Sequence, residues 1–427
     1  MILFYRVLTN ILYPFLIIVL LLRVFFKKED SKRYKEKIFV KNFNIKKKNN
    51  SILYWFHAAS IGEFRSIVPI IKNLNENKKN TQFLITTTTL SSSHLVKKEF
   101  NKFDNIFHRF MPLDINHLIN KFLNGWKPKK IFLVDSEIWP NLILNAEQKK
   151  IPIALINARL TKKSFSRWLK FPKTAERIFG IFHLCICSNN ETKKFLERLK
   201  AKKINYMGNI KFINEIHKSE LSKNNYKMLK NSRFWVAASI HKEEDILCLK
   251  AHIEIKKRYN DVITIIAPRH IKRVTKIKSL SESLGLNTQI LNQNDDILNK
   301  TEIVILNSFG VLNDYFQHAK SVFIGKSMVK KLKNDSGQNP IDAAYLNCKI
   351  YHGPYVSNFD EVYEILKQNE ISQRVEHLHD LSQNLIEDLK NIKKVPGDKS
   401  NNIQILGKSI LLNTMKTINN FLYDKIS

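Results

Sequence analysis

Short apolar runs alternate with amphipathic stretches along most of the chain, and this alternation constrains the fold more than any other feature. Amphipathic patterns such as Gly62–Asn75, Ser91–Phe100, Lys242–Tyr259 and Asn339–Leu346 predict helices between the apolar runs. Strands that alternate with helices are typical of parallel βαβ units, so we expect an α/β protein. The apolar runs predict strands at Ser51–His57, Gln82–Thr87, Lys130–Val134, Ile151–Asn157, Leu184–Ser188, Phe234–Ala238, Val262–Ala267, Thr288–Leu291, Ile303–Leu306, Ser321–Ile324 and Cys348–Tyr351.

The alternation lapses once, in the polar stretch Asn209–Asn231, and then resumes. A chain of 427 residues exceeds what one hydrophobic core usually serves. We therefore predict two Rossmann-like domains that face a cleft, one over residues 29–215 and one, with a terminal helix, over residues 216–427. The dinucleotide fingerprint G-x-G-x-x-G is absent after the first strand, which argues against a dehydrogenase.

The N-terminal segment, residues 1–28, is predicted to be a membrane anchor. Ile2–Phe26 is apolar apart from four polar or charged residues, and as a helix it would be about 37 Å long, enough to cross a bilayer core of about 30 Å. A basic cluster follows from Lys27 to Lys37, and by the positive-inside rule it places the rest of the chain in the cytoplasm. A helix that lies in the membrane interface is a rival interpretation, because Arg6 and Arg23 lie near its two ends.

The net charge of +33 comes from 71 Lys and Arg against 38 Asp and Glu. This excess could serve an anionic partner, but the lysines are spread widely, so we interpret most of them as solvated surface and predict no nucleic-acid partner. A local basic face beside membrane lipids is compatible with the same charge. The cysteines show no zinc spacing, so buried thiols are favoured over a metal site or a disulfide, and no metal is expected; they are Cys185, Cys187, Cys248 and Cys348.

Three motifs of the first half lie directly after predicted strands or at the predicted domain junction. His57–Glu63 (H-A-A-S-I-G-E) places Glu63 in a first helical turn, where it could act in a site or simply complement the helix dipole. Asp135–Asn141 (D-S-E-I-W-P-N) combines carboxylates with an aromatic ring, which indicates a sugar or hydroxyl site or merely a capped helix start. Met207–Phe212 carries Lys211, which could neutralise a phosphate or carboxylate. Because the chain has so many lysines, however, there is little reason to expect a functional role for any single one.

Three further motifs lie in the second half. Ala267–His270 presents the Arg269 guanidinium at a strand end, and such a fork matches a phosphate group. Ser308–Gly310 is a short glycine-containing loop. Asp335–Asp342 resembles a glycine-containing loop that leads into a helix N-terminus, where free N–H groups bind anions, with Pro340 as the first helical residue.

In this order and spacing the motifs resemble the transferases of 3-deoxy-D-manno-octulosonic acid (Kdo) of lipopolysaccharide synthesis, glycosyltransferase family 30. The resemblance covers nearly the whole chain. It rests on H-A-A-S-I-G-E, E-I-W-P-N, N-A-R-L-T, G-N-I-K-F, A-A-S-I-H-K-E-E, A-P-R-H, G-Q-N-P-I-D-A-A and H-G-P-Y-V-S-N-F.

The resemblance implies an inverting, metal-independent enzyme of the GT-B fold without a cofactor. It implies transfer of Kdo from the co-substrate CMP-Kdo to the lipid A precursor (lipid IVA) at the cytoplasmic face of the inner membrane. Residues 29–215 would form the acceptor domain and residues 216–427 the CMP-Kdo-binding domain. Glu63 matches the family's general base, and Glu137 and Lys211 match positions that stabilise the transition state.

The same resemblance assigns the donor-binding residues, with three departures. Val311 and Asp342 stand where the family usually has Glu, and Ser336-Gly337-Gln338 replaces Gly-Gly-His, so a contact to a ribose hydroxyl would be shorter or missing. The matched CMP-binding residues are Pro268, Arg269, Phe309, Gly310, Val311, Asn339, Pro340, Ile341 and Asp342.

Two other classes of function remain open at this stage. One is a GT-B enzyme that uses another donor, such as UDP-GlcNAc, for an envelope lipid, which the ordered motifs disfavour. The other is a non-catalytic membrane-bound scaffold or binding protein, which the charge of +33 favours but which leaves Glu63 and Lys211 without a role.

Overall fold

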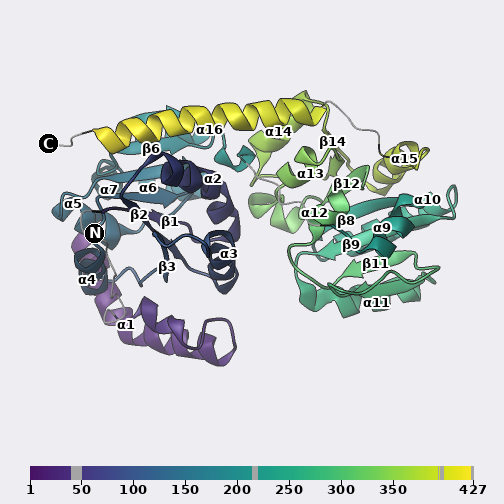
Figure 1. Ribbon diagram of the computed structural model, residues 1–427, viewed down its shortest axis with the longest axis horizontal. Helices are drawn as coiled ribbons and strands as arrows, with labels where there is room; N and C mark the ends of the chain where they lie inside the picture. The colour runs from purple at the N-terminus through teal and green to yellow at the C-terminus, as the bar shows by residue number, and fades with distance from the viewer. Residues whose placement is uncertain (40–50, 214–219, 393, 395–398, 425–427) are drawn as a thin grey trace. The chain divides into compact units, whose positions relative to one another are not determined.

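The computed structural model describes residues 1–39, 51–213, 220–392, 394 and 399–424, and it divides into two compact units (Figure 1). Unit 1 comprises Met1–Asn214 together with Gly407–Ser427, and unit 2 comprises Glu215–Leu406. The change from unit 1 to unit 2 falls within the polar stretch that the sequence marks as the junction, part of which lies outside the described residues.

Unit 1 is built around a parallel seven-stranded sheet in the order β3-β2-β1-β4-β5-β6-β7. The strands are β1 (Ile52–His57), β2 (Thr81–Thr87), β3 (Ile106–Phe110), β4 (Lys130–Val134), β5 (Ile153–Ala158), β6 (Leu184–Cys187) and β7 (Ile204–Tyr206). The helices that follow them are α2 (Ile61–Asn77), α3 (Leu90–Phe100), α4 (Asn116–Trp126), α5 (Pro140–Gln148), α6 (Lys162–Leu169), α7 (Pro172–Phe179) and α8 (Asn190–Arg198).

The central strands of unit 1 are buried on both faces, which explains why they read as nearly continuous apolar runs. Every residue of β4 and β5 is buried, and β1 is buried from Leu53 onward. Helix α4 contributes one apolar face, on which Ile119, Phe122 and Trp126 are fully buried. The strand order reverses between β1 and β4, and in open parallel sheets ligands bind at the carboxyl ends of the strands at such a reversal.

Unit 2 repeats this architecture with a second parallel seven-stranded sheet, in the order β10-β11-β9-β8-β12-β13-β14. Its strands are β8 (Arg233–Ile240), β9 (Val262–Pro268), β10 (Thr288–Leu291), β11 (Ile303–Leu306), β12 (Ser321–Ile324), β13 (Lys349–His352) and β14 (Ser372–Arg374). Its helices are α9 (Lys223–Lys230), α10 (Glu244–Lys256), α11 (Val274–Ser283), α12 (Leu312–Phe316), α13 (Ile341–Tyr345), α14 (Asp360–Gln368) and α15 (Leu378–Asp388). The order reverses between β8 and β12.

The strands predicted from the apolar runs are all present, and two Rossmann-like folds are confirmed. Three strands were not predicted: β3, β7 and β14, each at or next to a sheet edge. Their residues are largely intermediate or exposed, as the sequences IFHRF, INY and SQR suggest, so they carry a weaker hydrophobic signal than the central strands. Helix α9, inside the polar stretch, was missed for the same reason.

The terminal helix α16 (Lys399–Tyr423) differs from its predicted place. The sequence assigned it to the second domain, whereas the residues from Gly407 onward belong to unit 1. The Phe421 ring meets Phe132 of β4 edge-on at 5.6 Å between centroids, and the Lys130 ammonium donates to the Phe421 carbonyl. Ile410 of this helix packs against Gly208, where the φ of +90° favours glycine and a Cβ atom would lie 2.8 Å from the Ile410 side chain.

The N-terminal segment forms one continuous helix, α1 (Ile2–Phe25), that runs through Pro14. It is the one helix among the described residues that is long and apolar enough to cross a membrane. A short 3₁₀ helix, η1 (Arg33–Lys37), follows it.

Candidate active site

The three residues predicted to be catalytic lie together at the carboxyl edge of the unit 1 sheet. Glu63 stands in the first turn of α2, directly after β1, as the motif predicted. Glu137 follows β4, the neighbour of β1 across the reversal of strand order. Lys211 comes from the short 3₁₀ helix η3 (Ile210–Phe212) after β7, and its ammonium donates to Asp135 Oδ2, also just after β4, at 2.9 Å.

Glu63 is held by the cap of its own helix. The Ser60 side chain accepts the Glu63 N–H at 3.3 Å, and the Ser60 hydroxyl donates to Glu63 Oε1 at 2.9 Å. The second carboxylate oxygen, Oε2, accepts the Ala59 N–H at 2.7 Å. This is a variant of the capping box, in which Ser and Glu satisfy free N–H groups at a helix start. The structural and the chemical interpretations of Glu63 are thus compatible, because the cap fixes the carboxylate that would react.

The surroundings of Glu63 make it a better base than an ordinary glutamate. Burial raises the pKa of the Glu63 carboxyl, and the negative charges of Asp135 and Glu137 raise it further, while the hydrogen bonds from Ser60 and Ala59 act in the opposite sense. A carboxyl group with a raised pKa holds a proton more strongly once it has taken one, which suits general-base catalysis.

Glu137 is positioned by two ring N–H groups. The Trp139 indole Nε1 donates to Glu137 Oε2 at 2.7 Å, and His57 Nε2 lies 3.2 Å from the same oxygen. His57 is fully buried at the end of β1, where its Nδ1 is 2.9 Å from the Thr86 hydroxyl. Trp55 Nε1, which can only act as a donor, donates a hydrogen bond to that hydroxyl at 2.8 Å.

His57 also faces an acceptor on its other side, because its Nδ1 lies 3.1 Å from the Thr86 carbonyl oxygen. The Glu137 carboxylate favours a proton on Nε2, since a bare Nε2 lone pair would face the carboxylate oxygen. The His57 ring thus links the end of β2 to Glu137, which follows β4.

Lys211 is held by a largely buried ion pair in an unusual backbone setting. Asp135, its partner, has a φ of +63°, and Asn157 at the end of β5 has a φ of +53°. Asn and Asp adopt such left-handed angles more readily than other residues with a side chain. The Asn157 side chain accepts the N–H of Ile210 at 3.0 Å, so the turn that carries Lys211 is bonded to the sheet edge. Asp135, His57 and Thr86 were not predicted as site residues, although the first two lie in motifs that the sequence analysis singled out.

The predicted donor residues of unit 2 likewise gather at the carboxyl edge of its sheet. Pro268 ends β9, and the N–H of the exposed Arg269 donates to the Ile240 carbonyl at the end of β8, at 3.0 Å. Basic groups surround this point: burial, followed by the positive charges of Lys326, His270, Arg269 and Arg273, lowers the pKa of His241 to about 4. A positive environment of this kind favours the binding of a phosphate group.

The other predicted donor residues begin two short helices that contact each other, α12 and α13. Phe309, 73% exposed, precedes Gly310, whose φ of +83° explains the glycine, and Val311 caps α12. Asn339 accepts the N–H of Ile341 at 3.0 Å, and Asp342 lies in the first turn of α13. Pro340 is therefore the N-cap rather than the first helical residue, because the Asn339 side chain closes the turn before it.

Sequence reasoning missed one residue of this edge, Glu244, which has no exposed surface. Its Oε2 accepts the N–H groups of His241 and Lys326 at 2.8 and 2.7 Å, and its Oε1 accepts those of Ser327 and Met328 at 2.8 and 3.0 Å. The carboxylate thereby joins the loop after β8 to the loop after β12, across the reversal of strand order. The motif A-A-S-I-H-K-E-E contains Glu244 but does not show that the second of its two glutamates is buried.

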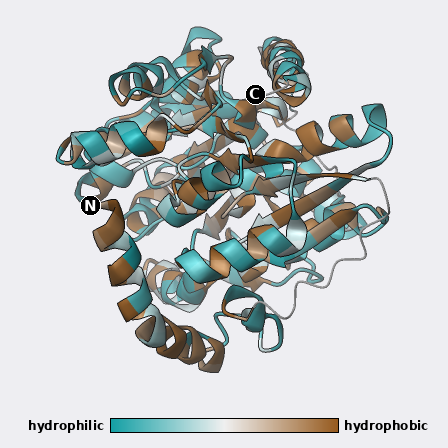
Figure 2. Ribbon diagram, turned by 90° about the vertical axis from the view of Figure 1, so that its left-hand side faces the viewer, coloured by the Kyte–Doolittle hydropathy of each residue, from teal (hydrophilic) through white to brown (hydrophobic). Residues whose placement is uncertain are grey.

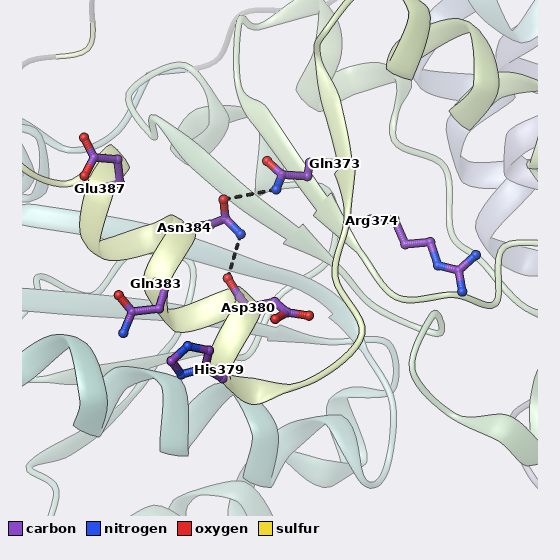
Figure 3. A pocket seen from close by; sticks show the side chains of 7 residues that line it. All are labelled: Gln373, Arg374, His379, Asp380, Gln383, Asn384 and Glu387. Atoms are coloured by element: carbon purple, nitrogen blue, oxygen red, sulfur yellow. Dashed lines mark hydrogen bonds between the residues drawn. The ribbon is translucent and has the colours of Figure 1, made fainter.

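A depression of about 520 Å³ lies elsewhere in unit 2, between β14 and α15 (Figure 3). None of the predicted site residues lines it, and the residues that line it are all polar or charged. The Asn384 side chain of α15 accepts from the Gln373 side chain of β14 at 3.1 Å and donates to the Asp380 carbonyl of its own helix at 2.7 Å. Within the described residues, no group of three or more His, Cys, Asp or Glu side chains gathers as a metal site.

Known proteins resemble this chain in sequence. Residues 32–214 match the family described as 3-deoxy-D-manno-octulosonic-acid transferase (kdotransferase). A probable mitochondrial 3-deoxy-D-manno-octulosonic acid transferase of Arabidopsis thaliana is 31% identical over 326 residues, which cover 74% of this chain and 72% of that protein. The 3-deoxy-D-manno-octulosonic acid transferase of Rickettsia felis is 32% identical over 333 residues, covering 77% of this chain and 70% of that protein. The chain belongs to the 3-deoxy-D-manno-octulosonic acid (Kdo) transferase family. It is accordingly a glycosyltransferase.

Solved structures support the fold of this Kdo transferase family member. A UDP-N-acetylglucosamine 2-epimerase superposes with a TM-score of 0.58 at 11% identity, covering 88% of this chain and 98% of that one. A putative UDP-N-acetylglucosamine 2-epimerase of Listeria monocytogenes gives a TM-score of 0.56 at 11% identity over the same shares. At such low identity the likeness shows the GT-B type of fold alone.

Proposed function

We propose that this enzyme transfers Kdo from CMP-Kdo to a hydroxyl group of the lipid A precursor. The observation that carries the proposal is the Glu63 carboxylate, which is fixed by its helix cap and has a raised pKa at the reversal of strand order in unit 1. Membership of the Kdo transferase family supports the identity of the transferred sugar.

In the proposed reaction, Glu63 takes the proton of the acceptor hydroxyl as that oxygen attacks the anomeric carbon of Kdo. The new carbon–oxygen bond forms while the bond from the anomeric carbon to the CMP phosphate oxygen breaks, and CMP leaves with the electron pair. A single displacement from the face opposite the leaving group inverts the anomeric centre. Glu137 and Lys211 would stabilise the transition state, as in the family that the motifs resemble.

The donor would be bound by unit 2, where Arg269 and Lys326 provide positive charge for the CMP phosphate. We propose that these groups neutralise the charge of the phosphate, so that transfer needs no bound metal and no cofactor beyond CMP-Kdo. The acceptor would be bound by unit 1 at the inner membrane, and the Rossmann-like folds would lie on the cytoplasmic side.

The direct test is transfer by the purified enzyme from CMP-Kdo to lipid IVA dispersed in detergent, measured as the mass of the product lipid. Anomeric inversion would be read from the NMR spectrum of the product, and activity in the presence of EDTA would test metal independence. Transfer from UDP-GlcNAc and not from CMP-Kdo would replace the proposal with another GT-B activity. No transfer from either donor would support a non-catalytic binding protein.

We expect Arg269→Ala to weaken CMP binding by about 1.5–3 kcal/mol, because hydrogen bonds to charged groups contribute about that much. The fold should tolerate the change, since the Arg269 side chain is exposed and only its backbone N–H bonds to the sheet. Calorimetric titration with CMP gives the measurement. Lys276→Ala, which removes an exposed positive charge from α11 of the same unit, is the matched control and should bind CMP normally. Equal affinity of both variants would remove Arg269 from the donor site.

A further inference from the structure

One side of α1 is bonded to unit 1 along the first half of the helix. The Tyr5 hydroxyl donates to Asp114 Oδ2 at 2.9 Å, Thr9 Oγ1 accepts from the Asn141 side-chain amide at 3.4 Å, and the Tyr13 hydroxyl donates to the Ile38 carbonyl at 3.1 Å. Residues four apart lie on one face of a helix. Tyr5, Thr9 and Tyr13 therefore define an inner side of α1 that lies against the rest of unit 1, which we call the body.

The far end of α1 is bonded to the same unit. Near that end Leu20 is only 5% exposed, and the Arg23 guanidinium donates to Glu29 Oε1 at 2.8 Å. Glu29 also accepts from the Lys37 ammonium at 2.6 Å, and Lys37 in turn donates to the Thr88 carbonyl at 3.0 Å. Unit 1 thus holds the polypeptide both before and after the second half of α1.

The opposite side of α1 is apolar and uncovered. Seven large apolar side chains there are each more than half exposed, and we call them the outer face of α1: Leu3, Phe4, Ile11, Phe15, Ile18, Leu22 and Phe25. In Figure 2 the helix that starts at the N mark is largely brown, the colour of hydrophobic residues. A continuous apolar surface of this length is unusual on a soluble monomer and marks a binding surface.

These attachments argue against a membrane-spanning orientation of α1. Residues up to Tyr13 are held at the body, and so is Arg23. Between these two residues the helix rises about 15 Å, half of the roughly 30 Å of a bilayer core. A spanning helix would have to break the bonds of Tyr5, Thr9 and Tyr13.

The charges beside the outer face fit the surface of an anionic bilayer. Lys27, Lys28, Lys32 and Lys35 are exposed in the segment that follows Phe25 and Phe26. An apolar helix face beside lysines is typical of helices that lie in the membrane interface, because the apolar face enters the acyl boundary while the cations meet the anionic head groups.

We propose that α1 lies in the plane of the membrane interface, with its outer face in the lipid and both of its ends on the same side as the body. The enzyme would then be a monotopic membrane protein, in place of the spanning anchor that length and hydropathy alone predict. This inference rests on the proposed siting at the membrane and specifies how that siting is achieved.

The first test replaces three outer-face residues in Ile11→Lys/Phe15→Lys/Leu22→Lys. Flotation of the full chain with vesicles of phosphatidylcholine and phosphatidylglycerol should show binding reduced by at least about tenfold, since lysine is costly in an apolar interface. The matched control, Leu298→Lys/Ile405→Lys/Leu412→Lys, adds the same charge at apolar residues that are 64%, 65% and 71% exposed elsewhere, and should still float. Equal flotation of the two triple variants would overturn the proposal. A parent protein that is dimeric without lipid, and becomes monomeric only in the outer-face variant, would assign the face to a second copy and also overturn it.

The second test locates the N-terminus. In inverted inner-membrane vesicles, an N-terminal epitope tag should be digested by added protease together with the body, and a tag protected inside the vesicles would show that α1 spans. Kdo transfer to acceptor in detergent micelles separates this inference from the proposed activity. The outer-face variant should keep its rate there, whereas failure of the parent enzyme in micelles would contradict the proposed function and leave the topology result intact.

Discussion

Replacing Glu63 with Gln is expected to lower the rate of Kdo transfer by about 10²–10⁴-fold, the usual contribution of a general base. Gln has the same shape but cannot take the proton of the acceptor hydroxyl. Its amide can still accept the Ala59 N–H through oxygen and donate to the Ser60 hydroxyl through nitrogen, so the helix cap should survive. CMP affinity and melting temperature should therefore stay close to those of the parent enzyme.

A second variant separates the cap from the chemistry. Ser60→Ala removes the cap and should lose about 0.5–2 kcal/mol of stability while keeping the Glu63 carboxylate. Melting temperature, CMP affinity and transfer rate are measured on one preparation of each protein. A Glu63→Gln enzyme that melts normally and transfers within a few-fold of the parent would end the assignment of Glu63 as base.

The pH dependence follows from the same residue. A general base acts only when deprotonated, so transfer should fall as the pH drops through the pKa of Glu63. Since burial and the charges of Asp135 and Glu137 raise that pKa, the loss should begin at a higher pH than an unperturbed glutamate would give. Glu137→Gln removes one of the negative charges and should move the acid limb of the rate profile to lower pH, whatever it does to the maximum rate.

The fold could be predicted from the sequence because the central strands are buried on both faces and read as apolar runs, as Leu53–His57 shows. Edge strands such as β14 could not, because two of its three residues are exposed. The position of α16 could not be predicted from the sequence either, because its contact through Phe421 is with Phe132 of β4, a strand far away in the sequence. Local pattern carries no information about such long-range packing.

The sequence motifs predicted the main residues of the candidate site but not the groups that support them. Glu63, Glu137 and Lys211 were named because they resemble the residues of a family, and the sheet topology then brings them to one edge. The supporting groups were not predicted, because their roles depend on hydrogen bonds between separate strands. His57 acts on Glu137 from one strand end to the next, and Thr86 reaches His57 from a third strand.

Glu244→Gln should lower the stability of unit 2 strongly. A carboxylate can accept all four N–H groups that face Glu244, whereas an amide presents one oxygen and turns its own N–H₂ toward two backbone donors. Two buried N–H groups would be left without an acceptor, at about 1–3 kcal/mol each, so we expect a loss of about 2–6 kcal/mol. Repacking is restricted, because a Cβ atom on the adjacent Gly325 would already lie 2.5 Å from the Ile240 Cα.

The neighbouring glutamate provides the control for this experiment. Glu243 is exposed, with a side chain 54% accessible and paired with Lys331 at 3.5 Å, so Glu243→Gln should change stability by less than about 0.5 kcal/mol. Calorimetric melting of both variants, with and without CMP, gives the comparison. The Glu244 variant should also lose CMP affinity, because Lys326 and His241 sit on the two loops that the carboxylate joins. Equal melting temperatures for the two variants would mean that these loops hold their places without Glu244, and the donor edge of unit 2 would then need another support.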